Sequence, residues 1–317
     1  MVTSQIGVAG MTAEARTWYE KQLQSRNVPD FLHEKFGAKR NIPGNGGDRI
    51  SIRQFNSLTG GATVLTPLVE GTPPAVTNAT VSETIISVAI LGAYMYGSDK
   101  LKAQAIDPQL SEWSAVFSDM MYDARDRYVR GFLNVGTNVA YVGGGAVRSS
   151  VASGAALGWT DLRTARKILK NANAPAYEGG MYAAIIRPVV MSQLFADSTV
   201  VNALQYAGPR TEQNDLFKGS ITALLGIAFN ETSNATTFSG LSQSAGFIEA
   251  TLFCGRDGYA VTNFDEISSE IIFHDIGSSG IVDPLNQAWS LGFKTAVGAG
   301  IIDQARVLRY ESWSTGS

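Results

Sequence analysis

Near the end of the chain, bulky and small residues alternate over residues 289–301. The bulky parity comprises Trp289, Leu291, Phe293, Thr295, Val297, Ala299 and Ile301. The other parity comprises Ser290, Gly292, Lys294, Ala296, Gly298 and Gly300. A period of two predicts a β-strand whose bulky side faces a core. Because glycine inside a strand often marks a close approach, we expect a neighbouring backbone or a long helix to lie against the small side.

The middle of the chain predicts one long amphipathic helix over residues 109–135. Asp107 can cap its start, Pro108 suits its first position, and Gly136 ends it. Apolar residues recur every three or four positions: Leu110, Trp113, Phe117, Met120, Ala124, Tyr128, Phe132 and Val135. The outer face carries two helix-favouring pairs of opposite charge, Asp123 with Arg127 and Asp126 with Arg130. At 1.5 Å per residue, residues 110–135 of this helix would span about 39 Å, and the helix would act as a strut.

A shorter stretch, RISIRQF at residues 49–55, also alternates. Residues 62–70 offer a return strand, and glycines flank the pair on both sides, so we predict a long two-stranded hairpin. An isolated hairpin is only marginally stable in water. It therefore needs a surface to lie on, which can belong to its own chain or to a neighbouring one.

The remaining segments predict an α+β organisation. Residues 12–26 have the spacing of an amphipathic helix, a helical turn follows at residues 31–36, and residues 77–98 suit one or two strands. Residues 147–280 mix helices, strands and polar loops, with a hairpin expected at residues 247–262, and indicate a second domain. Residues 281–317 should return to the first domain as a closing hairpin that bends at residues 302–304.

Composition narrows the classes of function. The net charge is −3 and charged residues make up 17% of the chain, so the chain lacks the basic surplus of a typical nucleic-acid binder. The low charge content favours a surface covered by partners over a merely uncharged, glycine-rich one. A single cysteine, Cys254, excludes a disulfide within the chain and a cysteine-based zinc site.

Candidate catalytic groups are weak. His33 and His274 have no partner at metal-ligand spacing, and the glycine-rich stretches GNGGD and GGGAVRSS lack the lysine of a phosphate-binding loop. The carboxylates at positions 119, 123 and 126 are interleaved with arginines, which favours an ion-pair face over an acid–base pair. We predict no catalytic, cofactor-binding or metal-binding residues, no cofactor, and a structural protein rather than an enzyme.

Several stretches, taken in order, resemble a known family. They are YEKQL (19–23), FGAKRNIP (36–43), RISIRQF (49–55), TPLVEGTPP (66–74), FLNVGTNVAYVGG (132–144), LFKGSI (216–221), DPLNQAWSLGFK (283–294) and DQARVLR (303–309). The chain resembles the major capsid proteins of tailed bacteriophages, which have the Hong Kong 97-type fold, and looks closest to their podovirus-associated branch.

The resemblance implies an α+β capsid fold with five parts. These would be an N-terminal arm (1–35), an extended β-hairpin loop (36–76), a peripheral domain (77–146) with the spine helix at 109–135, an axial domain (147–280), and closing strands (281–317). The extended loop would lie across an adjacent subunit. Because this loop would begin within about 40 residues of Met1, no large N-terminal scaffolding segment is expected.

The resemblance also implies the assembly and its partners. The chain would form hexamers and pentamers of an icosahedral head around packaged double-stranded DNA, without sequence-specific DNA binding or a membrane. A separate scaffolding protein, a portal and possibly a decoration protein would be partners. The protein would be made in the cytoplasm of the host bacterium and end in the virion capsid.

Charged residues on the loop and the helix are candidates for contacts between subunits. They are Lys35, Lys39, Arg40, Arg49, Arg53, Glu70, Asp123, Asp126, Arg127 and Arg130. The alternative for each is an ordinary solvated charge. Two other functions stay open at this point: an encapsulin-like shell around a protein cargo, and a soluble α+β hydrolase that uses an unrecognised carboxylate site.

Overall fold

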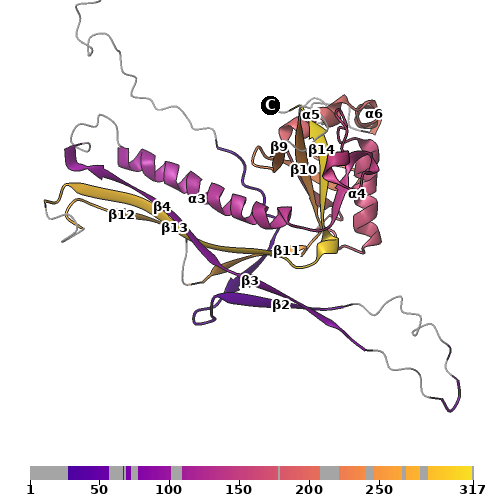
Figure 1. Cartoon of the computed structure of the whole chain (residues 1–317), viewed down its shortest axis with the longest axis horizontal. Helices are drawn as coiled ribbons and strands as arrows, with labels where there is room; N and C mark the ends of the chain where they lie inside the picture. Colours follow the sequence, from indigo (N-terminus) through magenta and orange to yellow (C-terminus); the bar gives the residue numbers. More distant parts are fainter. Residues whose placement is uncertain are drawn as a thin grey trace, which may run out of the picture.

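The computed structural model describes residues 28–56, 67, 69–72, 78–100, 109–177, 179–207, 221–239, 246–265, 269–278 and 285–315. The molecule has an elongated part, a compact part and a projecting two-stranded ribbon (Figure 1). The predicted α+β fold class is confirmed. The helix predicted at residues 12–26 lies outside the described residues, and the chain makes a turn between Leu32 and Lys35.

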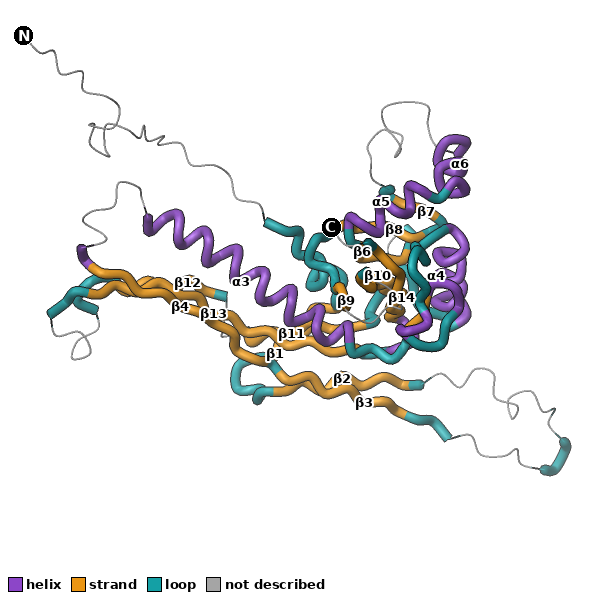
Figure 2. The backbone as a smooth tube through the Cα atoms, turned by 45° about the horizontal axis from the view of Figure 1, so that its top comes forward, coloured by secondary structure: helices purple, strands orange, loops and turns teal. Residues whose placement is uncertain are grey.

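The elongated part is a five-stranded sheet with the long helix α3 (Gln109–Asn134) along one face (Figure 2). The strands are β1 (Ala38–Ile42), β4 (Ala89–Ser98), β11 (Tyr259–Phe264), β12 (Glu270–His274) and β13 (Ala288–Ile301). β13 is central, with β4 on one edge and both β11 and β12 on the other. β1 joins β11 in parallel. The predicted long helix and the predicted long strand are both confirmed.

The compact part is a seven-stranded sheet with three helices gathered around it (Figure 2). Its strands are β5 (Val139–Tyr141), β6 (Tyr182–Ile186), β7 (Ala223–Leu224), β8 (Ile227–Glu231), β9 (Thr237–Ser239), β10 (Phe247–Cys254) and β14 (Val307–Ser314). The helices are α4 (Trp159–Asn171), α5 (Pro188–Ala196) and α6 (Ser198–Ala207). Short 3-10 turns lie at Val142–Gly144, Arg148–Ser150 and Gln304–Arg306. Leu162, Leu169, Ile186, Leu194 and Phe253 belong to its core.

Two long chain segments connect the parts, and they pair with each other in both sheets. One runs from β10 into β11 and the other from β13 into β14; β10 pairs with β14, and β11 pairs with β13. At the corner between the sheets, residues 255–258 lie between the pairs Cys254–Val307 and Tyr259–Ile301, opposite residues 302–306. Four residues therefore face five, and the extra residue lets the strand pair bend, as in a β-bulge.

This crossing corrects two sequence-based expectations. Residues 247–262 do not form a hairpin, and β13 and β14 do not close one, because each segment changes sheets at the corner. β11 and β12 thus pair in the elongated part, whereas β14 pairs in the compact part, so the boundary expected at residue 280 is not where the chain changes sheets. Glycine-rich turn signals mark a corner as well as a hairpin turn, and the sequence pattern did not separate the two.

The ribbon consists of β2 (Arg49–Phe55) and β3 (Val81–Ser87), paired antiparallel and projecting from the body (Figure 1). The predicted hairpin therefore exists, but its return strand is β3 rather than residues 62–70. Residues 57–66 lie outside the described residues. β3 is rich in β-branched residues, so its strand propensity is as high as that of residues 62–70. Strand propensity therefore did not identify which segment pairs with β2.

The alternation along β13 separates a core side from a close-contact side. Trp289, Leu291 and Phe293 are buried beneath α3, in a cluster with Phe117 and Met121. On the small side, a Cβ atom at Gly298 would lie 2.7 Å from the backbone oxygen of Ser87 and 2.3 Å from Thr262 Oγ1. The sequence left open whether a backbone or a helix lies against this side; the structure places the backbone of the ribbon's base there.

Candidate subunit interface and interdomain junction

The outer face of the ribbon is exposed along its whole described length. It carries Arg49, Ser51, Arg53 and Phe55 from β2, and Val81, Glu83, Ile85 and Ser87 from β3. Phe55 pairs directly with Val81, and their exposed fractions are 80% and 50%. Two strands provide too little surface to cover such side chains themselves. The ribbon therefore presents apolar groups that need an external surface.

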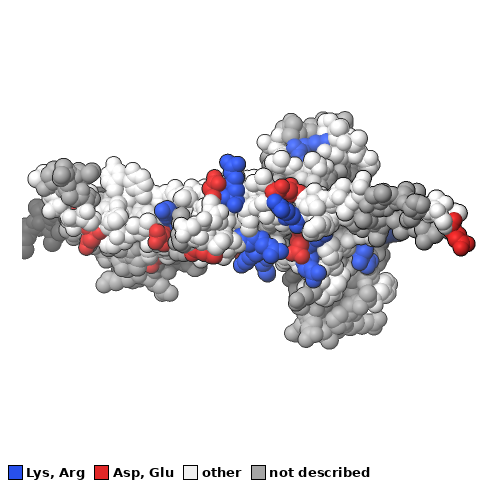
Figure 3. Space-filling view, turned by 90° about the horizontal axis from the view of Figure 1, so that it is seen from below, with Lys and Arg blue, Asp and Glu red and all other residues white. Residues whose placement is uncertain are grey.

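A second apolar surface lies on the five-stranded sheet, on the face away from α3. Ile90, Tyr94 and Tyr96 of β4 are exposed there, the two tyrosines by about three quarters. The small residues of β13 leave a shallow groove of about 360 Å³ beside Tyr94, with Ile272 also lining it. Seen from this side, the elongated part carries few charged side chains, and Lys and Arg gather nearer the middle of the molecule (Figure 3).

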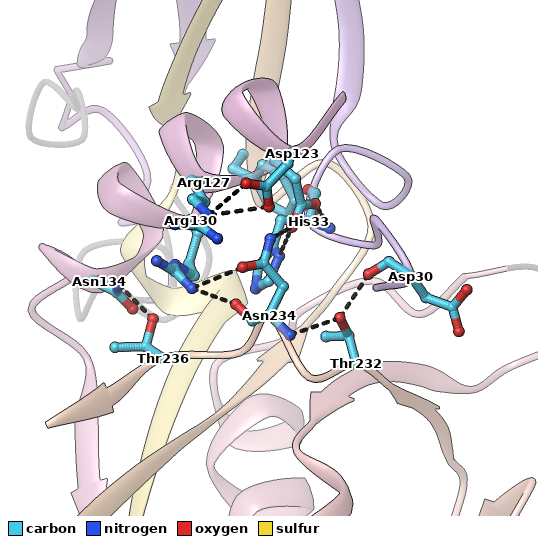
Figure 4. Close-up of polar contacts among 11 residues, drawn as sticks. Asp30, His33, Asp123, Arg127, Arg130, Asn134, Thr232, Asn234 and Thr236 are labelled. Atoms are coloured by element: carbon cyan, nitrogen blue, oxygen red, sulfur yellow. Dashed lines mark hydrogen bonds and ion pairs between the residues drawn. The ribbon is translucent and has the colours of Figure 1, made fainter. Parts of the chain in front are cut away.

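A buried polar junction joins the end of α3 to the compact part (Figure 4). Asp126, Arg130 and Asn134 are spaced four residues apart, so they share one stripe of the helix. Asn234 donates to Asp126 Oδ2 (2.7 Å), and Arg130 donates to Asn234 Oδ1 (3.2 Å). One turn on, Asn134 donates to Thr236 Oγ1 (2.7 Å). The loop between β8 and β9 is thus bound at three successive turns of α3.

The segment that precedes β1 completes this junction. Asp126 Oδ1 accepts the backbone N–H of His33 (2.8 Å), and Asp126 Oδ2 lies 2.8 Å from His33 Nδ1. Tyr259 donates to the His33 carbonyl (2.6 Å), and Thr232 donates to the Asp30 carbonyl (2.6 Å). His33 and Asp126 are fully buried. Desolvated polar groups require such partners, so the junction is expected to fix the angle between the two parts.

Next to it, Arg125 ties the same segment to the elongated sheet. Its guanidinium pairs with Glu34 (2.5 Å) and donates to Thr295 Oγ1 (3.0 Å) and to the Ala296 carbonyl (3.3 Å). Burial of this arginine is tolerable because its donors have partners.

The compact part contains two further buried carboxylates that are neutralised within the chain. Glu311 is fully buried and pairs with Arg148 (2.5 Å) and Arg309 (2.8 Å). The hydrogen bond to Glu311 raises the pKa of Arg148 above its usual value. Glu249 pairs with Arg187 (3.3 Å) and accepts a hydrogen bond from Ser314 (2.9 Å). These groups were not among the residues predicted from the sequence, although a charge inside an apolar strand sequence is a usable signal of a buried ion pair.

The structure separates the predicted interface residues. The exposed ones are Lys35, Lys39, Arg40, Arg49, Arg53 and Glu70. The predicted Asp123–Arg127 pair forms on the outer side of α3, with Nε and Oδ2 2.8 Å apart. The expectation for Asp126 needs correction, because this residue is buried within the subunit. Its carboxylate and the guanidinium of Arg130 are directed to junction partners rather than to each other.

The remaining candidate chemistry consists of isolated groups. Burial raises the pKa of the Cys254 thiol to about 12, so this side chain behaves as a small buried hydrophobe. Within the described ranges, no cluster of three or more His, Cys, Asp or Glu residues could hold a metal ion. Among the helices that the structure describes, none is long and apolar enough to cross a membrane.

Comparison with known proteins places this geometry among solved structures. The chain superposes over its whole length on a chain of the cyanophage Pam1 capsid, with a TM-score of 0.77 and 13% identity, and covers all of that chain. This chain has the fold of a bacteriophage capsid protein. Against the capsid of Ralstonia phage GP4, the chain has a TM-score of 0.70 at 14% identity, with 98% of both chains covered. For the Helicobacter pylori bacteriophage KHP30 capsid, the TM-score is 0.71 at 10% identity, with 98% of this chain and 100% of that chain covered.

The capsid fold predicted from the sequence is therefore confirmed. No family model matches the chain, and no curated protein sequence matches it. Assignment to the podovirus-associated branch stays a prediction. The likeness lies in the arrangement of the elements rather than in residue identity, because all three structures share at most 14% of their residues with the chain.

Proposed function

We propose that the chain is the major capsid protein of a bacteriophage head and assembles into hexamers and pentamers of an icosahedral shell around double-stranded DNA. The observation that carries this proposal is the ribbon β2–β3, which projects from a folded body with apolar side chains uncovered. A monomer gains nothing from such a ribbon. A subunit that is completed by its neighbours requires one.

In this proposal the ribbon of one subunit lies on the uncovered sheet face of the next. Phe55 and Val81 would cover the groove beside Tyr94 and Tyr96, so that both apolar surfaces leave water. Complete burial of a side chain of this size contributes about 1.5–3 kcal/mol. One such contact is weak, but every subunit of a closed shell makes and receives it.

In the proposed shell, each part of the molecule has a role of its own. The elongated part with α3 would be the peripheral domain, and the compact part the axial domain that gathers at capsomer centres. The exposed charges Arg49, Arg53 and Glu70 on the loop, with Lys35, Lys39 and Arg40 at its base, would pair with neighbouring subunits. Arg127 stays a candidate on the outer side of α3.

A scaffolding protein, a portal and a decoration protein are proposed partners, and the virion capsid is the proposed location. The encapsulin-like alternative is less favoured, because the similar structures named above are all phage capsids. Particles that contain DNA and a portal would support the phage head, whereas closed shells around a protein cargo would support the alternative.

The test is production of the full chain alone and together with candidate scaffolding proteins from its source genome. Sedimentation velocity would separate monomers, capsomers and shells, and negative-stain electron microscopy would show their form. We expect capsomers or closed shells in at least one condition. Monomers under every condition would overturn the proposal.

A further inference from the structure

The helix α4 (Trp159–Asn171) has one apolar face and one basic face. Leu162, Ala165 and Leu169 are buried in the core of the compact part. On the other side, all of the basic residues of the helix are exposed: Arg163, Arg166, Lys167 and Lys170. We call these four residues the basic strip. They follow the spacing i, i+3, i+4 and i+7, which aligns them along one side of the helix.

Within the described residues, no carboxylate pairs with the basic strip. Asp161, the one acidic residue of α4, is directed elsewhere: it accepts hydrogen bonds from Tyr310 Oη (2.8 Å) and from the Gly158 N–H (3.1 Å). Like charges four residues apart destabilise a helix. Since Arg163 and Lys167, like Arg166 and Lys170, stand in this relation, the strip disfavours the helix. Within the described subunit no carboxylate offsets this repulsion, although Lys170 Nζ lies 5.6 Å from the centroid of the Tyr182 ring.

The strip borders a recess. All four of its residues and Leu225 line a hollow of about 320 Å³. Leu225 and Gly226 form the turn between β7 and β8 with φ values of 53° and 72°. A leucine with positive φ is uncommon, because this region suits glycine and asparagine. The guanidinium of Arg166 lies 3.5 Å from the position that a Cβ of Gly226 would occupy, so the turn lies directly beside the strip.

We propose that the basic strip binds the phosphate backbone of a nucleic acid. From Arg163 to Lys170 the helix rises about 10.5 Å. One DNA strand carries one phosphate per about 3.4 Å of helix axis, so about four phosphates lie along that length when both ends are counted, and four cations match their charge. A peptide partner would need apolar pockets for its anchoring side chains. Among the described residues, Leu225 is the one apolar residue that lines the recess. This small apolar contribution favours a ligand that binds through its charges.

This site goes beyond a shell-forming role, because it adds a direct nucleic-acid contact to the compact part. The net charge of −3 argues against a protein whose main function is to bind DNA. A local strip of four cations does not require a basic chain, so it is compatible with this net charge. Contacts to phosphates alone carry no sequence information and weaken steeply as salt rises. The binding is therefore local, without sequence preference, and dependent on salt.

The test uses the purified full chain and a fluorescent 24-base-pair DNA, with anisotropy measured from 50 to 300 mM salt. The variant Arg166→Glu/Lys170→Glu should lose at least tenfold in affinity at low salt. The slope of log K against log salt should fall by about two. The control Lys100→Glu/Arg256→Glu changes the net charge equally at two exposed cations elsewhere and should retain most of the affinity.

Three results would overturn the proposal: no DNA binding by the wild-type chain at 50 mM salt, equal loss in both double variants, or competition by polyglutamate as effective as competition by unlabelled DNA. The last would identify an acidic peptide as the ligand. Circular dichroism and microscopy of both variants separate loss of the site from loss of folding. A chain that forms normal shells but does not bind DNA would contradict the DNA-binding proposal and leave the proposed assembly intact. A chain that binds DNA but forms no shells would contradict only the proposed assembly.

Discussion

The compact part and the ribbon differ in how they cover their apolar side chains. In the compact part, every residue of β6 is buried, and so are all residues of β10 except Phe247. In the ribbon, the residues of one whole face are exposed, including Phe55 at 80%. The compact part satisfies its core within the chain, whereas the ribbon depends on something outside it. Changes in the first should alter subunit stability, and changes in the second should alter assembly.

The largest effect is expected where the ribbon meets the elongated sheet. Replacement of Gly298 by leucine would place its Cβ 2.7 Å from the Ser87 carbonyl, and a backbone oxygen in a paired strand cannot move aside. We expect no soluble folded subunit, as judged by yield and circular dichroism. Gly131→Ala, on the exposed side of α3 with no neighbouring atom, should instead stabilise by about 0.5–1 kcal/mol. Normal particles from Gly298→Leu would contradict the close contact.

A smaller effect is expected inside the compact part. Glu311→Ala would leave Arg148 and Arg309 without their shared buried carboxylate. Breaking a buried pair in this way costs about 3–5 kcal/mol of unfolding free energy, which urea denaturation of the unassembled subunit would measure. Asp48→Ala, which removes an exposed partner of Arg49, should change the urea midpoint very little. Equal effects of the two variants would argue against the buried network.

The ribbon should show the reverse behaviour. Phe55→Asp places a charge at a residue that is exposed in the subunit, so the unfolding free energy should fall by no more than about 1 kcal/mol, the contribution of its cross-strand pair with Val81. Particle formation, followed by electron microscopy, should be lost, because the charge would have to be buried against a neighbour. The control variant Phe55→Leu keeps an apolar side chain at this position and should retain particle formation. Normal shells from Phe55→Asp would exclude this residue from the contact.

The smallest effect is expected on the outer side of α3. Arg127→Ala removes an exposed pair with Asp123, four residues earlier, and should cost the subunit about 0.3–0.5 kcal/mol in urea denaturation. If assembly fails while stability changes this little, Arg127 contacts a neighbouring subunit. A loss above about 2 kcal/mol would mean that the pair is far less solvated than its exposure indicates.

The sequence predicted those elements whose pattern is local. The helix α3 and the strand β13 follow from their periods of three to four and of two, and the close approach at Gly298 follows from the small parity of β13. The return strand of the ribbon and the corner at residues 255–258 did not follow. Pairing partners there lie far apart in the chain, and local turn signals do not identify them.

The candidate site was predicted less completely than the fold. Asp126 has the sequence context of a surface ion pair, and its burial depends on the loop that carries Asn234, more than 100 residues away. Nothing within α3 marks that contact. Glu311 differs, because a charge inside the strand sequence VLRYESWS is a visible signal of a buried ion pair.

The central claim is that the ribbon is completed by a neighbouring subunit. Hydrogen–deuterium exchange with mass spectrometry, applied to the unassembled subunit and to assembled particles, tests it most directly. We expect β10 and β14 to be protected in both forms, and β2 and β3 to gain protection only in the particle. Equal exchange of β2 and β3 in both forms would contradict the claim.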